Sequence, residues 1–373
     1  MATFSKTTFD AASYLAFRPS YPRWTYTKLL AYHFGRLPSA SSPPPSPPPA
    51  PSAGSSPTVA LDLGCGPGIS TLALLPHFDR VIGLDPSKKM VDAAIRPESS
   101  SIPAELRSDA NEGGRGRLGT LEYRQGTAEE LDFLPEQSVD LIAAGQAAHW
   151  FKYDRLWPAL SRVLKPGGSV CFWGYPDMYL PDYPSTRPAV LEWAVGPSSS
   201  PGDGSGTTAA ESIGPYWEQP GRSIISNCFA DIPFPTAPEW DQATAIRRVF
   251  STEGLLPEQI PARWPPQASP GSPRPDTASL SAEARAELET PGNLEKSMTW
   301  EMMSSYLHTW SSVHNFLEEH PGDRDDPRGD VVERFLRRLR DEIGRGERGG
   351  RIPERVTLRW PVGFLFVKKA AAA

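Results

Sequence analysis

The stretch LDLGCGPGIST, residues 61–71, contains the residues with the clearest chemical implication in this sequence. Three glycines alternate at Gly64, Gly66 and Gly68, directly after a short apolar run, and Asp62 lies two positions before the first of them. Glycines between a strand and a helix let the backbone approach a ligand closely, and the amides at a helix start face that ligand. The pattern predicts a nucleotide-type cofactor here, and Asp62 suits a ligand with a positive end and no pyrophosphate.

A second acid points to a ribose. Asp85 ends the next apolar run, 21 positions after Gly64, and an acid about 20 residues after such a loop is where a ribose diol is hydrogen-bonded. The dinucleotide pattern G-x-G-x-x-G is not met, because Ile69 occupies the third glycine position, and no Lys-Ser/Thr pair follows to make a P-loop. Ile69 and Asp62 therefore argue against the competing hypothesis, a nicotinamide-dependent oxidoreductase.

Strands and helices that alternate along the chain must position these residues. Apolar runs predict strands at 58–64, 80–85, 121–127, 138–146 and 169–175, and helices at 22–36, 69–78, 86–95 and 153–164. The last of these helices carries Pro158, which we expect to interrupt it. Alternation with short turns predicts parallel pairing and an open, doubly wound α/β sheet with its ligand at the carboxyl ends of the strands.

The second half of the chain has a weaker pattern. Helices are expected at 187–195, 239–249, 298–318 and 329–343, and the tail 356–369 is expected to be strand with a turn at Pro361 and Gly363. An antiparallel edge strand of this kind often accompanies a parallel sheet. Segments of low complexity at 97–119, 196–212 and 261–292 are expected to be insertions, and the Pro/Ser-rich stretch 38–57 is expected to be a linker.

Composition excludes several classes of function. The formal net charge of −6 and the lack of a long basic run argue against nucleic-acid binding. No apolar stretch is long enough for a membrane span, and no signal or transit peptide is apparent. Three widely spaced cysteines favour a reducing compartment and no disulfide framework, so we expect a cytoplasmic protein. No His, Cys or carboxylate spacing indicates a metal site.

The stretch Asp62-Leu63-Gly64-Cys65-Gly66-Pro67-Gly68 resembles the first motif of class I S-adenosylmethionine-dependent methyltransferases, acid-x-G-x-G-x-G. GLDPS at the second strand and LKPGG before the fifth extend the resemblance over residues 58–175. It implies S-adenosylmethionine as cofactor and a Rossmann-like, mostly parallel seven-stranded sheet with a helical lid and disordered insertions. The cofactor-binding residues that it implies are Asp62, Gly64, Cys65, Gly66, Gly68, Asp85, Thr127, Ala128, Glu129 and Gln146.

Three further stretches are similar to the trans-aconitate methyltransferase-like proteins of fungi, namely residues 3–22, 146–157 and 309–317. This resemblance implies a small-molecule acceptor, with a carboxylate that becomes a methyl ester as the specific hypothesis. Arg18 and Tyr21 would hold the acceptor, and His149 would orient it or accept a proton. Two alternatives stay open: a methyltransferase that acts on a secondary-metabolite hydroxyl, and a non-catalytic cofactor-binding protein that works by interaction.

The expected organisation of the chain follows from these assignments. Residues 1–37 would form an N-terminal lid segment and helix, and residues 38–57 the linker. Residues 58–175 would form the cofactor-binding core. Residues 176–373 would supply acceptor-side helices, insertions and closing strands of the same domain.

Overall fold

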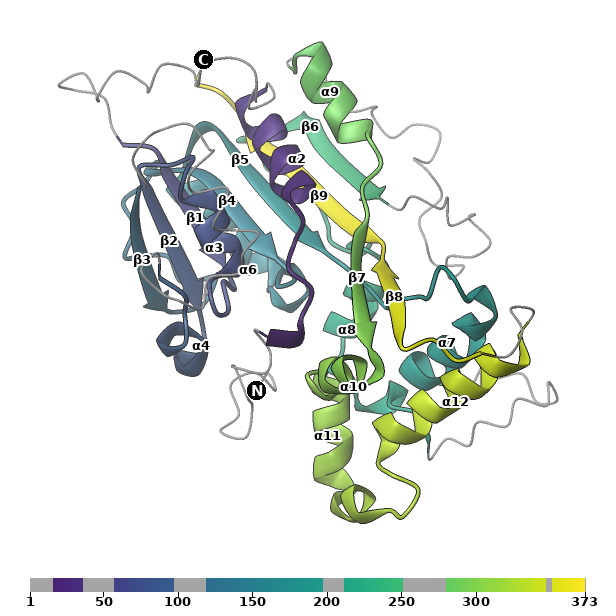
Figure 1. Cartoon of the computed structure of the whole chain (residues 1–373). Coiled ribbons are helices and arrows are strands. Elements are labelled where there is room, and N and C mark those ends of the chain that lie inside the picture. The colour runs from purple at the N-terminus through teal and green to yellow at the C-terminus, as the bar shows by residue number, and fades with distance from the viewer. Residues whose placement is uncertain are drawn as a thin grey trace. The chain divides into compact units, whose positions relative to one another are not determined.

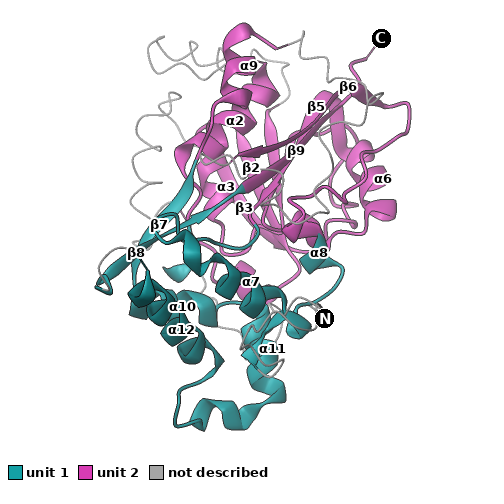
Figure 2. Ribbon diagram, turned by 90° about the vertical axis from the view of Figure 1, so that its right-hand side faces the viewer, with its two compact units in different colours: residues 1–19, 176–223, 293–361 teal, residues 20–175, 224–292, 362–373 magenta. Residues whose placement is uncertain are grey.

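The computed structural model describes residues 16–35, 57–96, 119–196, 211–250, 280–346 and 351–372. The predicted linker 38–57 and the predicted insertions 97–119 and 196–212 lie almost wholly outside these ranges. Within the described residues the chain forms two compact units (Figure 2). Unit 1 comprises residues 1–19, 176–223 and 293–361, and unit 2 comprises residues 20–175, 224–292 and 362–373.

Unit 2 is built on a seven-stranded sheet with the order β3-β2-β1-β4-β5-β9-β6 (Figure 1). The strands are β1 (Val59–Leu63), β2 (Arg80–Asp85), β3 (Thr120–Gln125), β4 (Val139–Gly145), β5 (Leu164–Gly174), β6 (Trp240–Phe250) and β9 (Val362–Lys369). Strands β1 to β5 pair in parallel, whereas β9 pairs antiparallel with both β5 and β6. The predicted mostly parallel, doubly wound seven-stranded sheet is confirmed.

Helices cover both faces of this sheet. They are α2 (Arg23–Phe34), α3 (Ile69–Leu74), α4 (Lys88–Asp92) and α6 (Tyr153–Val163). Helix α9 (Ala282–Glu289) packs against α2, and the residues of α8 (Gly221–Ser226) are divided between the two units. Neighbouring side chains on a strand point to opposite faces, so Phe172 packs against Trp157 of α6 while Trp173 packs against Tyr26 of α2. The alternation on β5 therefore places α2 and α6 on opposite faces.

In unit 2, one predicted helix is a strand and another is continuous where we expected an interruption. The predicted helix 239–249 is wrong, because these residues form strand β6, whose partner β9 lies more than a hundred positions later. The buried residues of this strand are Trp240, Thr244, Ile246 and Phe250, and the spacing of four from Trp240 to Thr244 and from Ile246 to Phe250 is also the spacing of a helix face. In α6, Pro158 does not interrupt the helix. One missing amide is tolerated because the apolar face of α6 belongs to the core cluster of the sheet.

Part of the predicted insertion 261–292 is ordered. Ser281 caps α9 by accepting a hydrogen bond from the Ala284 amide, at 3.1 Å. At its other end, the fully buried Lys28 of α2 donates to the carbonyls of Glu287 and Thr290. Lysine at a helix C-terminus satisfies carbonyls that lack helical partners, and these bonds hold α9 against α2. The burial of Lys28 lowers its pKa.

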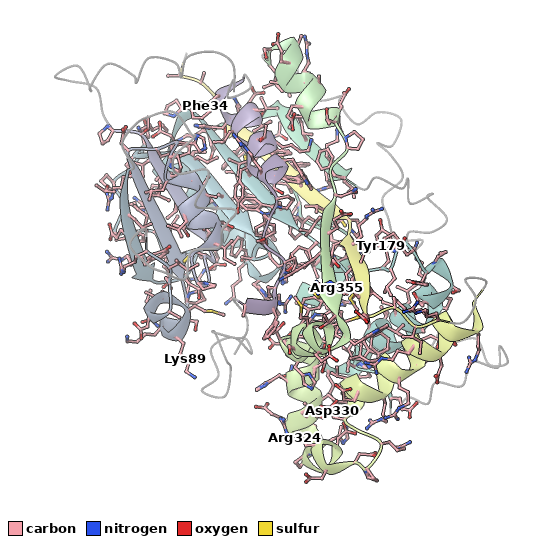
Figure 3. The ribbon with its side chains drawn as sticks, viewed as in Figure 1. Phe34, Lys89, Tyr179, Arg324, Asp330 and Arg355 are labelled. Carbon is pink, nitrogen blue, oxygen red and sulfur yellow. The ribbon has the colours of Figure 1, made fainter. Side chains whose placement is uncertain are left out.

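Unit 1 combines a two-stranded antiparallel sheet, β7 (Leu294–Thr299) and β8 (Arg355–Trp360), with helices α7 (Arg187–Val195), α10 (Trp300–His308), α11 (Ser311–Glu319) and α12 (Val331–Arg345). The predicted helix 298–318 is wrong as one element, because Trp310 is extended (φ −77°, ψ 133°) and separates α10 from α11. The predicted tail strand is two strands, β8 and β9, in different sheets. Figure 3 labels Asp330, which caps α12 through the amides of Val332 and Glu333.

Candidate cofactor-binding site

The glycine loop lies at the carboxyl end of β1 and its three glycines all have left-handed backbones. Their φ angles are 64° at Gly64, 53° at Gly66 and 88° at Gly68. Non-glycine residues pay about 1–2 kcal/mol for such angles. The alternating glycines that the sequence shows are therefore a backbone requirement of the turn that leads into α3.

The surroundings of the three glycines differ. A Cβ on Gly64 would lie 2.4 Å from the Cβ of Ala147, and a Cβ on Gly68 would lie 2.1 Å from the hydroxyl of Tyr123. A Cβ on Gly66 would meet nothing within 4 Å among the described residues. Gly64 and Gly68 thus pack against protein, whereas Gly66 borders open space.

Asp85 connects β2 to this loop. One carboxylate oxygen accepts the Gly66 amide at 2.9 Å, and the other accepts the Ser87 amide at 2.8 Å. Burial raises the pKa of Asp85, and the bonds from Ser87 and Gly66 oppose that rise. Because each carboxylate oxygen can accept two hydrogen bonds, both oxygens keep acceptor capacity for the hydroxyls of a diol.

Asp62 lies beneath the loop and is completely buried. Its Oδ2 accepts a hydrogen bond from the Thr71 hydroxyl at 2.7 Å, while its Oδ1 has no partner among the described residues. Burial raises the pKa of Asp62 to about 7, the Thr71 hydrogen bond opposes this, and the nearby charge of Asp85 adds to it. An ionised Asp62 is therefore stabilised by a positive charge on a bound ligand.

Because the pKa of Asp62 is raised, we expect the free energy of unfolding to depend on pH. A raised folded-state pKa contributes stability below the unfolded value of 3.8, and this contribution is lost as the pH rises through about 7. Denaturant unfolding of the wild type and of Asp62→Asn should therefore give curves that diverge between these pH values, with the wild type losing about 1.4 kcal/mol per unit of pKa shift. Parallel curves would show that Asp62 titrates normally. Asp92→Asn, at an exposed carboxylate paired with Lys88, is the control.

The predicted adenine-side residues follow β3. Thr127 and Glu129 are half-buried and Ala128 is buried. The Glu129 carboxylate accepts the amide of Lys152, at 2.8 Å, directly before α6 begins. Glu129 therefore ties the segment after β3 to the start of α6, and its role toward a cofactor stays a prediction.

Two further predicted cofactor residues have partners within the protein. Cys65 is buried, which raises the pKa of its thiol well above the usual value, so it packs as a small apolar group. Gln146 follows β4, and its side-chain amide makes two hydrogen bonds to the backbone of Tyr175. The structure brings Gln146 to the end of β5, and the loop contact between Gly64 and Ala147 lies one residue further on.

Of the predicted acceptor residues, two belong to unit 2. The ring of Tyr21 contacts those of Trp173 and Tyr175 at the end of β5, with centroid distances of 5.5 and 6.2 Å. His149 lies in the 3-10 turn Ala148–Trp150 after β4, buried, with its ring 4.7 Å from that of Trp150. Both residues therefore follow or contact strands at their carboxyl ends.

Arg18 belongs to unit 1. Its Nη2 donates to the carbonyl of Thr309 at 3.1 Å, and its guanidinium carbon lies 5.7 Å from the centre of the Tyr306 ring. Lys296 donates to the Arg18 carbonyl at 3.4 Å. Arg18 is thus held at the C-terminus of α10, where a helix favours a cation.

Tyr123 on β3 is a residue of the site that the sequence pattern did not reveal. Its hydroxyl donates to the Ile95 carbonyl at 2.8 Å, and its ring occupies the space where a Cβ on Gly68 or Gly83 would lie. The glycine in the middle of β2 was the available signal, because a glycine inside a strand marks a close approach of other atoms.

Neither a metal centre nor a membrane-spanning helix is found in the ranges that the structure describes. No group of three or more His, Cys, Asp or Glu side chains in these ranges could hold a metal ion. Among the helices of the same ranges, none has both the length and the apolar character needed to cross a membrane.

Comparison with known proteins gives consistent matches to this site. Residues 61–172 match the family described as "Methyltransferase domain" (Methyltransf_11). The chain is 25% identical over 224 residues to the probable S-adenosylmethionine-dependent methyltransferase CRG1 of Saccharomyces cerevisiae, in a match that covers 60% of this chain and 65% of the yeast protein. It is 34% identical over 116 residues to trans-aconitate 2-methyltransferase of Methylobacterium radiotolerans, and this match covers 30% of this chain and 36% of that protein. Both matches span less than two thirds of the relative.

A solved structure extends the similarity of fold. A putative type II methyltransferase from Anaeromyxobacter dehalogenans superposes with a TM-score of 0.51 over 95% of this chain and 100% of that one, at 20% identity. The sheet order, the glycine loop and the family match together define residues 61–172 as a class I S-adenosylmethionine-dependent methyltransferase domain. S-adenosylmethionine is the cofactor of this domain.

The residues present fit that cofactor. The ribose diol offers two donors, and Asp85 has acceptor capacity on both carboxylate oxygens. The sulfonium and ammonium groups are cationic, and Asp62 and Asp85 are two buried carboxylates at the loop. Gly66 borders space that a side chain would fill. When bound, S-adenosylmethionine supplies an electrophilic methyl group on sulfur.

Proposed function

We propose that this protein is a methyltransferase that moves the methyl group of S-adenosylmethionine to a carboxylate oxygen of a small organic acid. Methyl transfer from this cofactor is supported by one observation at the end of β1: the Gly66 amide donates to Asp85, and Gly66 borders open space. The choice of a carboxylate as the acceptor is supported by the similarity to a relative named trans-aconitate 2-methyltransferase.

The chemistry of this proposal makes modest demands on the protein. Methyl transfer from a sulfonium is an in-line displacement, so the protein mainly aligns the acceptor with the methyl group and excludes water. A carboxylate is already ionised at neutral pH and needs no general base. Tyr21 and His149 of unit 2 would orient the acceptor carboxylate through hydrogen bonds.

The test is an acceptor screen with a chemical readout. The protein is incubated with methyl-labelled S-adenosylmethionine and a panel of small carboxylic acids that includes trans-aconitate, and labelled products are identified by mass. We expect a product whose label is released by mild base, because methyl esters hydrolyse under these conditions and methyl ethers do not.

Other outcomes decide between the alternatives. A labelled product that survives base would contradict the carboxylate and favour a hydroxyl acceptor, for which His149 would serve as general base. Calorimetric titration with S-adenosylmethionine is run in parallel. Cofactor binding without transfer to any acid would contradict the proposed acceptor class, and no cofactor binding would contradict methyl transfer itself.

A further inference from the structure

Gln146 has an unfavourable backbone conformation at the end of β4. Its φ is 56°, in the left-handed region, where glycine is unstrained and asparagine is the commonest other choice. Strained residues of this kind gather at functional sites when the surrounding structure holds them. A glutamine here indicates that its side chain supplies contacts that a glycine would lack.

The side chain of Gln146 continues the β4–β5 pairing beyond the strands. The last register pair is Gly145 with Trp173, and the backbone N–H of Gln146 donates to the Trp173 carbonyl at 2.8 Å. Its Oε1 accepts the Tyr175 amide at 2.8 Å, and its Nε2 donates to the Tyr175 carbonyl at 3.0 Å. A primary amide presents a donor and an acceptor in one plane, so it acts here as a substitute for the backbone of a neighbouring strand.

The backbone that Gln146 holds carries the rings that contact Tyr21. Tyr175 and Trp173 lie at the end of β5 with ring centroids 6.2 and 5.5 Å from that of Tyr21, and Tyr26 of α2 lies at 6.5 Å. Both Tyr175 and Trp173 are buried, and so have little freedom to move independently of the strand end. The position of the Tyr21 ring therefore depends on where the end of β5 is held.

We infer that Gln146 is a positioning residue: it locks Tyr175 at the end of β5 and thereby fixes the ring of Tyr21 on the acceptor side. The resemblance to known methyltransferases had assigned Gln146 to the cofactor instead. The inference rests on the proposed function, in which Tyr21 orients the acceptor. It predicts that loss of the side-chain amide of Gln146 weakens acceptor binding and leaves cofactor binding unchanged.

The central variant is Gln146→Gly, which removes both side-chain bonds and also relieves the backbone strain, so that the fold is retained. Gln146→Glu is the second variant, because it keeps the size and one acceptor but places a carboxylate oxygen against the Tyr175 carbonyl. Gln137→Gly is the matched control, since Gln137 has a similar φ of 49° but lies before β4 and is exposed.

The first readout needs neither cofactor nor acceptor. Tyr21 is replaced by meta-fluorotyrosine, and its fluorine NMR signal is compared among the variants. We expect the signal to shift and broaden in Gln146→Gly and Gln146→Glu but not in the control. We also expect the Tyr175 amide to exchange about tenfold faster, as for one lost hydrogen bond. An unchanged fluorine signal overturns the inference.

The second readout separates the two roles of Gln146. Calorimetry should give the same affinity for S-adenosylmethionine in the wild type and in Gln146→Gly, and a weakened cofactor affinity with an unchanged fluorine signal would return Gln146 to the cofactor. Once an active acceptor is known, Gln146→Gly should raise KM for that acceptor about tenfold when Tyr21 is intact. Added to Tyr21→Ala, the same substitution should have little further effect, because the effects of coupled residues are not additive. If the wild type transfers no methyl group, the proposed function fails while the fluorine signal still decides the positioning role.

Discussion

Replacing Asp85 with alanine should abolish measurable binding of S-adenosylmethionine. The substitution removes the acceptor for the ribose diol and also the two bonds that tie the Gly66 and Ser87 amides to the end of β2. Hydrogen bonds to a charged group contribute about 1.5–3 kcal/mol each, so we expect the dissociation constant to rise at least about 100-fold, or about 2.7 kcal/mol. Calorimetric titration of the purified variant measures it.

Asp85→Asn separates charge from shape in the same experiment. The asparagine oxygen can still accept one amide, but its NH2 group faces the other amide as a second donor, and we expect a large loss of affinity here too. Asp92→Asn, seven residues later at an exposed position, should bind like the wild type. Wild-type affinity in Asp85→Ala, with an unchanged circular dichroism spectrum, would place the cofactor elsewhere.

Gly66→Ala should lose cofactor affinity while the protein stays folded. The new Cβ would meet no described atom within 4 Å, so it enters the space beside the loop without a clash inside the protein. The left-handed φ of 53° makes the substitution cost about 1–2 kcal/mol in backbone strain. We expect the dissociation constant for S-adenosylmethionine to rise at least about tenfold, with a modest drop in Tm.

Gly167→Ala is the matched control for this variant. Gly167 has a left-handed φ of 76° and no described atom within 4 Å of a new Cβ. It lies near the start of β5, whereas the site lies at the carboxyl ends of the strands. It should show the same drop in Tm and bind the cofactor like the wild type. Equal affinities in the two variants would mean that the space beside Gly66 is not used by the cofactor. Gly64→Ala and Gly68→Ala should instead lose more stability, because each new Cβ would collide with Ala147 or Tyr123.

The organisation of the fold could be predicted from short-range pattern. Strand β2 was predicted with the bounds that the structure has, Arg80–Asp85, and helix α7 likewise at Arg187–Val195. These elements are recognisable because their signals lie within the element itself: an apolar run that ends in an acid, and a helical period with proline near its start. Strand β6 was missed because its partner β9 and its irregular register are set by pairing across the sheet.

The candidate site divides in the same way. The sequence by itself determined the fold class, because strands and helices alternate along it. It also determined the position of the glycine loop, because three residues with left-handed backbones within five positions require glycine, whatever packs around them. Only the tertiary structure decided what each residue of the loop faces: Ala147 at Gly64, Tyr123 at Gly68, and open space at Gly66. It also decided that the amide of Gln146 pairs with Tyr175, 29 residues later. Such contacts join residues from different strands, and they depend on strand order and register, which local sequence pattern does not contain.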